Sequence, residues 1–362
     1  MNNSAIKFNN GAFMRKGLLH SDKTFTTTHM SGRHANRMLK IINILFAVAM
    51  ILKSALRTIV WYQESNDTAH YEDLYYRTAQ SSWQEIIRDF SFWGQTYADR
   101  DLGYSFFVKF SQIFSVDFRF FLFIIAIIFI VPVAILIYRN VHTKIGTVIS
   151  WLIYASLFSY LVDTAIKQSI ALGIIWASIG LIQRRKWYFY FPLVALCATI
   201  HGSAVLAIPL YFYPRLKQYK TLLVSVIIAL PLLILYGRGM MMYLASDTIY
   251  EAYAGYESES KPVVYTVMML LVVVSTLYNY KRLIKLENSS LYIGSVITAM
   301  ALSTMAWIYP TLLRMTFYYS VFIIPFIPNI INVMIINKYT KQLVNYGLVM
   351  ILLTITIIKF IR

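Results

Sequence analysis

The chain has 362 residues, of which 58% are hydrophobic and only 14% are charged, and its mean hydropathy is +0.59. Soluble globular chains are nearer a quarter charged, and no long polar segment remains for a soluble domain, so a soluble enzyme with one membrane anchor is excluded. The net charge is +17, and the single Cys197 excludes an intramolecular disulfide and any multi-cysteine metal site.

Residues 1–38 form a polar, basic N-terminal segment without an apolar core, so they are not a signal peptide. We predict that this segment is a disordered cytoplasmic tail. Residues 39–362 show no internal repeat and no low-complexity tract. They are therefore predicted to form a single membrane domain.

Apolar runs recur along the rest of the chain, and several approach the roughly 20 residues that a helix needs to cross a bilayer. They predict an all-α, polytopic integral membrane protein with about 10–12 transmembrane segments. The two runs on either side of His201 are short for full crossings and predict a tight helical hairpin. Residues 102–117 mix aromatic residues with Lys109 and Asp117, which predicts an amphipathic interfacial helix. In chain order, the candidate spans are 41–60, 118–138, 145–162, 165–182, 187–200, 202–213, 221–237, 262–279, 291–309, 315–336 and 343–360.

The distribution of charge orients these spans. Under the positive-inside rule, the segments that are basic and nearly free of acids are cytoplasmic. Eight of the 16 acidic residues lie in 61–104 and four more in 238–261, which predicts long outer loops at about 61–117 and 238–261. The positive net charge is then a signal of topology, and nucleic-acid binding is not needed to explain it. The basic segments are 138–144, 183–186, 214–220, 281–285 and 337–341.

One conflict remains in this topology. An odd number of crossings from a cytoplasmic N-terminus places the C-terminal IIKFIR outside, against the same rule. The number of spans and the side of the C-terminus therefore stay open.

Several ionisable residues lie near the predicted outer ends of the spans. Such residues at membrane depth are costly and usually face a protein-lined or water-lined cavity. Each cation alone could reach a lipid headgroup, and a lone histidine at a turn is more often structural. Their convergence on the side where lipid-facing basic residues are scarce favours a functional site. The residues concerned are Arg57, Asp163, Lys167, His201, Arg238 and Arg314.

The chemistry of these residues suits an anionic glycolipid. Cations at bilayer level suit a phosphate or pyrophosphate, and arginine offers paired hydrogen bonds to it. The outer loops are rich in aromatic residues; an interfacial aromatic belt explains some of them, but it explains less well the interleaved acids and tyrosines of YEDLYY, residues 71–76. A lipid-pyrophosphate-linked oligosaccharide satisfies all of these features together.

An ordered set of short motifs resembles a known family. The motifs are ALRTIVWYQESNDTAHY with Arg57, Asp67 and Tyr71, DLGYSFF with Gly103 and Tyr104, IKQSIAL with Lys167, Gln168 and Ala171, IHGSA with His201, Ser203 and Ala204, and LLRMTFYY with Arg314. This set, over about residues 40–330, resembles the EpsG-like, Wzy-type bacterial polysaccharide polymerases. Two positions depart from the family pattern: Lys167 stands where an arginine is expected, and Asp101 where a glutamate is usual.

The resemblance implies a glycosyltransferase at the outer face of the bacterial inner membrane. It would join oligosaccharide repeat units carried on undecaprenyl pyrophosphate, for an O-antigen, a capsule or an exopolysaccharide. We expect His201 or Asp67 to act as the base, because an acceptor hydroxyl must lose its proton. Pyrophosphate and substrate binding would involve Arg57, Lys167, Arg314, Arg238, Gln168, Tyr71, Tyr104 and Asp101.

The expected partners are the lipid-linked donor and acceptor, the bilayer and, further, a chain-length regulator and a flippase. No cofactor, metal site or nucleic-acid partner is expected, because the sequence has no metal-ligand spacing and no glycine-rich phosphate loop.

Two other functions stay open. A lipid-linked oligosaccharide flippase would need a cationic cavity reachable from both faces and internal repeats, which the sequence does not show. A membrane O-acyltransferase can also use an intramembrane histidine and arginine, but its donor enters from the cytoplasm. Entry from the cytoplasm would favour buried polar residues on the cytoplasmic side of the membrane, whereas the ionisable residues named above lie near the predicted outer ends of the spans.

Overall fold

The computed structural model describes residues 22–57, 68–88, 101–245, 262–307 and 310–361, with some side chains near the ends of these ranges left out. Every regular element in this part of the chain is a helix, and no strand occurs in it. The first half contains α1 (Asp22–Ala55), α2 (Thr68–Gln80), α3 (Trp83–Arg88), α5 (Leu102–Ser111), α6 (Phe118–Asn140), α7 (Lys144–Leu157), α8 (Ser159–Thr164), α9 (Ile166–Ala177) and α10 (Ile179–Gln183).

The second half begins with α11 (Trp187–Ile200), the 3-10 helices η1 (Gly202–Tyr211) and η2 (Tyr213–Arg215), and α12 (Tyr219–Ala245). It continues with α14 (Val263–Tyr278), α15 (Tyr280–Leu283), α16 (Ser289–Ser303), η3 (Met305–Trp307), η4 (Pro310–Thr316), α17 (Phe317–Ser320), α18 (Ile323–Val333) and α19 (Lys338–Ile361). The predicted all-α, polytopic membrane fold is confirmed.

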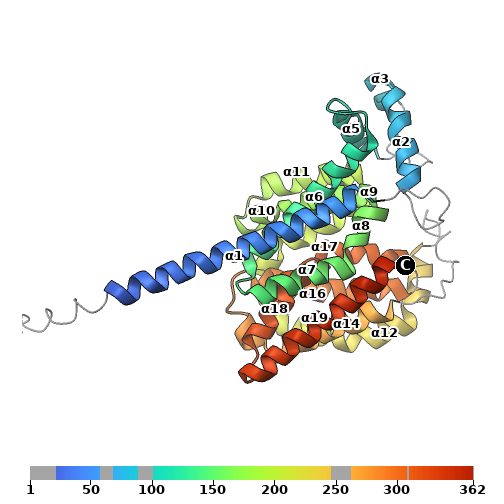
Figure 1. Ribbon diagram of the computed structural model, residues 1–362. Helices are drawn as coiled ribbons and strands as arrows, with labels where there is room; N and C mark the ends of the chain where they lie inside the picture. Colours follow the sequence, from blue (N-terminus) through green and yellow to red (C-terminus); the bar gives the residue numbers. More distant parts are fainter. Residues whose placement is uncertain (1–21, 58–67, 89–100, 246–261, 308–309, 362) are drawn as a thin grey trace, which may run out of the picture.

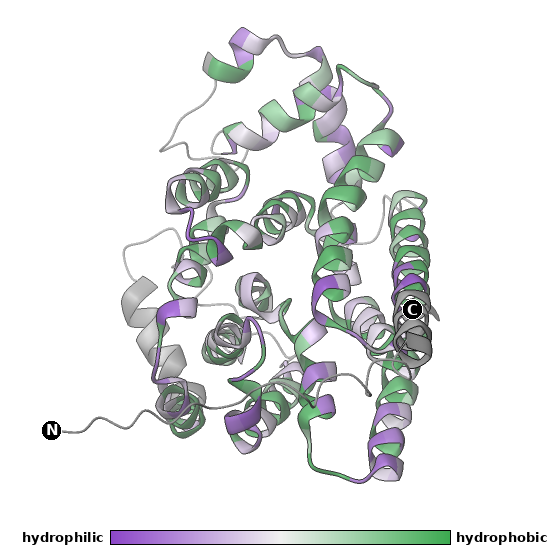
Figure 2. Cartoon of the chain, turned by 90° about the vertical axis from the view of Figure 1, so that its left-hand side faces the viewer, coloured by the Kyte–Doolittle hydropathy of each residue, from purple (hydrophilic) through white to green (hydrophobic). Residues whose placement is uncertain are grey.

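Five described helices are long and apolar enough to cross a membrane, or six if the bent pair of segments 312–320 and 323–333 counts as one span. Four shorter apolar helices accompany them, over 144–157, 187–200, 219–232 and 263–278. Figure 2 shows that most of the helical ribbon is hydrophobic, and α19 exposes large apolar side chains such as Leu343, Met350 and Ile351. In a bilayer such side chains face lipid, whereas in water they would form an unusually large apolar surface.

Two of the predicted spans are broken. The run 145–162 divides into α7 and α8, and the run 165–182 divides into α9 and α10. The first break lies at Phe158, which has φ −117° and ψ −21°. Ala165, which separates α8 from α9, has non-helical φ −119° and ψ 60°. At the second break the Ser178 hydroxyl donates to the carbonyl of Ile175 at 2.7 Å, a local bond that competes with the helical ladder.

The first helix is longer than its apolar run. α1 begins at Asp22, so residues 22–38 of the segment predicted as a disordered tail are helical in the structure. Its N-terminal part projects away from the other helices (Figure 1). The helix continues outward without a break because good helix formers such as Ala35, Arg37 and Met38 precede the apolar run.

The apolar half of α1 packs along α6, and Asn43 ties it to two neighbours. The Asn43 side-chain amide donates to the carbonyl of Ala134 in α6 at 2.9 Å and accepts from the indole of Trp151 in α7 at 2.9 Å. Asn43 is buried, so these bonds satisfy a polar group that lipid could not solvate. They fix the rotation of α1 and thereby the direction of the side chains at its C-terminal end.

The predicted hairpin around His201 is present. α11 ends at Ile200, His201 is extended, and η1 returns along α11, with the Tyr190 hydroxyl donating to the carbonyl of Ala207 at 2.7 Å. The returning arm is a 3-10 helix, and it contains Pro209, which has no backbone N–H for an α-helical ladder. His201 therefore lies at a sharp turn between two packed arms.

The helical bundle has two opposite ends, and we define each by residues that lie there. The site end is the end where Lys53, Asp163 and Lys359 lie, since Lys53 pairs with Asp163 and Lys359 donates to the carbonyl of Ser156 next to α8. The C-terminal end of α19 thus lies at the site end. The helices α2, α3 and α5 extend beyond this part of the bundle (Figure 1).

The opposite end, the basic end, gathers loops that the charge pattern grouped as cytoplasmic. Gln183 donates to Asn288 at 2.9 Å, and Asn288 donates to the side chain of Asn140 at 3.4 Å. Asn329 donates to the backbone carbonyl of Asn140 at 3.1 Å. These bonds bring the ends of α6, α10 and α18 and the start of α16 together.

The structure agrees with the prediction for the first outer loop but differs at the start of the second. α2, α3 and α5 occupy the described parts of 61–117, and α5 confirms a helix over the first ten residues of the predicted interfacial segment. The second loop was predicted to begin at residue 238, but α12 continues to Ala245. The apolar run Met240–Leu244 and Ala245 prolong the helix, so the charge of Arg238 does not end it.

Candidate functional site

A buried ion pair joins α5, in the predicted outer loop, to the apolar helix α9. The ammonium of Lys167, in the first turn of α9, lies 2.5 Å from a carboxylate oxygen of Asp101, the N-cap residue of α5. Only 12% of the Lys167 side chain and 17% of the Asp101 side chain are exposed. A pair this poorly solvated has a large electrostatic energy, because few waters screen it.

The ring of Tyr104 forms one wall of this ion pair. The Lys167 ammonium lies 5.0 Å from its centroid, a cation–π geometry. Tyr71 in α2 packs edge-on against Tyr104 with centroids 6.0 Å apart. Within the described parts of the chain, the buried Tyr104 hydroxyl has no hydrogen-bond partner. Burial raises its pKa well above the usual value, so it stays protonated and can donate.

A close contact with α11 sets α5 beside the His201 turn. A Cβ atom on Gly103 would lie 2.1 Å from the Thr199 Oγ1 and 2.9 Å from the Thr199 carbonyl carbon. No residue other than glycine permits this approach without displacement. The approach brings Asp101 and Lys167 into the electrostatic neighbourhood of His201.

His201 lies among the charged groups of the site. In this turn, outside the spanning helices, burial lowers the pKa of its imidazole below the ordinary value; the carboxylate of Asp101 opposes this effect, and Lys167 and Arg314 add to it. The imidazole is therefore neutral at neutral pH and able to accept a proton. The neighbouring Ser203 hydroxyl forms a 3.0 Å hydrogen bond with the hydroxyl of Tyr318.

Arg314 belongs to the irregular segment between α16 and α17, in η4. The side-chain amide of Gln168, in the first turn of α9, donates to the Arg314 carbonyl at 2.8 Å. This bond fixes η4 beside Lys167, the neighbour of Gln168 in sequence. We call Asp101, Lys167, His201 and Arg314 the histidine group.

Arg57 lies in a second group of charges. One guanidinium nitrogen is 3.7 Å from Asp163, which also pairs with Lys53 and accepts a 2.9 Å hydrogen bond from Ser54. Arg119 donates to the Arg57 carbonyl. We call Lys53, Arg57, Arg119 and Asp163 the arginine group; it holds three cations and one acid.

The guanidinium of Arg57 is incompletely satisfied. Its side chain is 9% exposed, and Nε and Nη2 are buried without a hydrogen-bond partner among the residues that the structure describes. Burial lowers the Arg57 pKa, with Asp163 opposing the shift, but an arginine starts so high that it stays charged. Two unused donors on a buried cation are typical of a place where an anion binds.

The histidine group thus brings together Asp101, Lys167, His201 and Arg314, with Gln168, Tyr71 and Tyr104 around it. The structure does not describe the side chains of two other predicted site residues. Asp67 falls outside the described residues, as does the side chain of Arg238, which belongs to α12. Within the described residues, no group of three His, Cys, Asp or Glu could hold a metal ion.

Two members of the arginine group were not among the predicted site residues. Lys53 precedes Arg57 by one helical turn, so the i, i+4 spacing could have indicated that both lie on one side of α1. Arg119 begins the span at 118–138 opposite its basic end, which marks it as a cation at the site end.

A sequence model described as the EpsG family matches residues 40–362, nearly the whole chain. The chain belongs to the EpsG family. No curated protein and no solved structure matches the chain. The predicted resemblance is confirmed over a longer range than the motifs covered. Membership of the EpsG family indicates a polysaccharide-related polymerase role for a multi-pass membrane protein.

Proposed function

We propose that this member of the EpsG family is a polymerase that joins oligosaccharide repeat units carried on undecaprenyl pyrophosphate. The observation that carries the proposal is the histidine group, in which a neutral imidazole stands beside Lys167 and Arg314 under an aromatic helix of the outer loop. The charge pattern supports a location at the outer face of the bacterial inner membrane.

In the proposed reaction, an acceptor sugar hydroxyl attacks the anomeric carbon of the donor glycan. His201 takes the hydroxyl proton as the new glycosidic bond forms, with Asp67 as the second candidate for this role. The bond between the anomeric carbon and the pyrophosphate oxygen breaks, and its electron pair leaves with the lipid pyrophosphate. Lys167 and Arg314 stabilise the negative charge that grows on this leaving group.

The reaction uses two lipid-linked substrates, and each enters with a pyrophosphate. The arginine group offers a second cationic site, separate from the histidine group, with unused donors on Arg57. We assign it to the pyrophosphate of the lipid that is not cleaved. Tyr71, which is partly exposed, would stack on a sugar ring, and the buried Tyr104 would support it by packing edge-on against it.

The test uses His201→Ala and Arg314→Ala in cells that lack the native gene. We expect both variants to lose long polymer and to retain single repeat units on the lipid, measured by gel electrophoresis and by mass spectrometry of the lipid fraction. His142→Ala and Arg184→Ala are the matched controls, since both side chains are exposed at the basic end. Unchanged polymer in both site variants would overturn the proposed site.

A further inference from the structure

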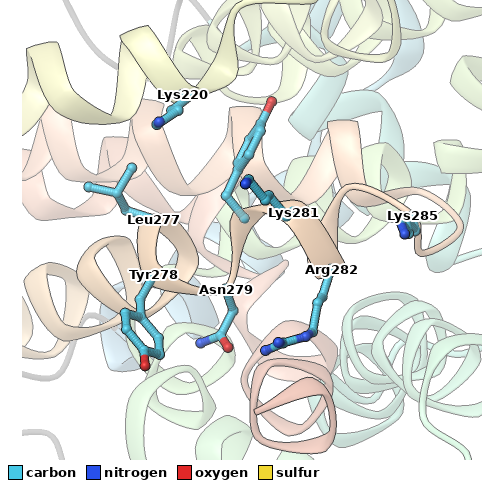
Figure 3. Close-up of a pocket in the computed structure, with 8 residues that line it drawn as sticks. Lys220, Leu277, Tyr278, Asn279, Lys281, Arg282 and Lys285 are labelled. Atoms are coloured by element: carbon cyan, nitrogen blue, oxygen red, sulfur yellow. The ribbon is translucent and has the colours of Figure 1, made fainter. Parts of the chain in front are cut away.

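A basic cavity lies at the opposite end of the bundle from the candidate site. It has a volume of about 630 Å³ and lies between the start of α12 and the junction of α14 with α15. Figure 3 shows Lys220, Lys281, Arg282 and Lys285 around it. Two basic segments that are far apart in the sequence, 214–220 and 281–285, therefore meet at one cavity.

All four charged residues that line the cavity are cations. Among the described residues, none of the four forms an ion pair with a carboxylate. Glu287 follows shortly after Lys285 but does not line the cavity. In the described part of the chain, the only hydrogen bond of these side chains is a long one, from Arg282 to the Val333 carbonyl at 3.5 Å. All four side chains are exposed, so water screens the repulsion among them, and an anion bound at the cavity would neutralise part of this charge.

The cavity lies at the depth of lipid headgroups. Leu277 and Tyr278 end the apolar helix α14 and form part of its wall, and the Tyr278 side chain is 86% exposed. Tyrosines at the ends of membrane helices mark the headgroup level of the bilayer. An anion bound here can keep an apolar tail in the bilayer beside α14.

We propose that this cavity binds a phosphate-bearing anion, and that a membrane phospholipid with an anionic headgroup supplies it. The four cations would bind the phosphate oxygens, with Arg282 able to offer two parallel hydrogen bonds. Asn279 also lines the cavity, and its side-chain oxygen is buried with no hydrogen-bond partner in the described part of the protein. It could accept from a headgroup hydroxyl, such as those of the glycerol in phosphatidylglycerol.

Topology alone does not account for this arrangement. The positive-inside rule requires cations in the loops but does not require two loops to place four of them around one cavity. The control must therefore remove the same charge from the same end of the bundle outside the cavity. Lys144 and Arg184 meet this condition, because both are exposed in basic segments and neither lines the cavity.

The experiment compares the full-length protein with Lys281→Gln/Arg282→Gln and with the control Lys144→Gln/Arg184→Gln. Native mass spectrometry and thermal unfolding are measured with phosphatidylglycerol, with phosphatidylcholine, and with phosphatidylcholine plus inorganic phosphate. Size-exclusion profiles and helical content of the variants check the fold. These measurements require no polymerase activity, so they fail or succeed independently of the proposed reaction.

We expect the native protein and the control to retain and be stabilised by phosphatidylglycerol over phosphatidylcholine. The cavity variant should lose affinity on the order of tenfold or more, because each surface cation contributes substantially to binding an anionic lipid. Stabilisation by inorganic phosphate that the cavity variant loses would support the anion site and assign it to a soluble phosphate. Equal affinity of the cavity variant and the control, for both the lipid and phosphate, would overturn the proposal.

Discussion

At the level of single residues, the two buried cations of the candidate site differ in how their charges are compensated. Lys167 has a close carboxylate partner in Asp101, whereas Arg57 shares Asp163 with Lys53 and keeps two donors unused. The two residues therefore respond differently to substitution. At Lys167, we expect a substitution that keeps the positive charge to be tolerated. At Arg57, we expect an apolar substitution to raise stability and to lower polymer formation.

Lys167→Arg should keep long polymer, because it preserves the positive charge beside Asp101 and restores the residue expected from the family pattern. Lys167→Gln should lower polymer formation on the order of a hundredfold, since it removes a cation that we propose to stabilise the leaving pyrophosphate. The measurement is the rate of glycan extension in membranes from strains with matched protein levels. Equal loss in both variants would show that the exact ammonium geometry matters rather than its charge.

Arg57→Met should raise the thermal unfolding midpoint of the purified protein by a few degrees while lowering polymer formation. Burying unsatisfied guanidinium nitrogens costs free energy, and an apolar side chain of similar length removes this cost. Functional sites commonly sacrifice stability in this way. Differential scanning fluorimetry and the polymer profile provide the two readouts. A lower midpoint with full polymer would assign Arg57 a structural role.

At the scale of elements, the site depends on three junctions. The break at Ala165 starts a new helix just before Lys167, and the His201 turn reverses the chain between α11 and η1. The third junction is the crossing of α5 over α11 at Gly103 and Thr199. Each junction places a residue of the proposed site at or next to the end of a helix.

Gly103→Ala should lower polymer formation by about tenfold or more, because its methyl group would overlap the Thr199 hydroxyl and approach the Thr199 carbonyl. The resulting shift of α5 separates Asp101 from Lys167 and moves Tyr104. Gly180→Ala is the control, since a Cβ there meets nothing within 4 Å. Thr199→Ala should restore only part of the activity of the Gly103 variant, as the backbone contact remains. Wild-type activity of Gly103→Ala would exclude this crossing as a determinant of the site.

At the scale of the whole molecule, the apolar runs were sufficient to locate most helices. The runs 118–138 and 187–200 agree with α6 and α11, since a membrane helix is specified by its own hydropathy. The breaks inside two spans were not predictable in this way, because they depend on local bonds such as that of Ser178. The helical start of α1 before residue 38 was missed because a polar helix lacks a hydropathy signal.

The charge pattern also predicted that Lys167, His201 and Arg314 would share one end of the bundle. It did not predict that Arg57 belongs to a separate group, since this depends on how Asn43 fixes the rotation of α1 against α6 and α7. The pairing of Asp101 with Lys167 was also missed, because it joins segments that only tertiary packing brings together.

The most direct test of the proposed polymerase is the lipid-linked glycan profile of a strain that lacks this protein, with the membrane side of the lipid determined by an impermeant glycan-labelling reagent. We predict single repeat units on undecaprenyl pyrophosphate, accessible from the outer face, and no long polymer. Repeat units trapped on the cytoplasmic side would indicate a flippase. Polymer of normal length that lacks acyl groups would indicate an acyltransferase. Either of these two results would contradict the proposed polymerase.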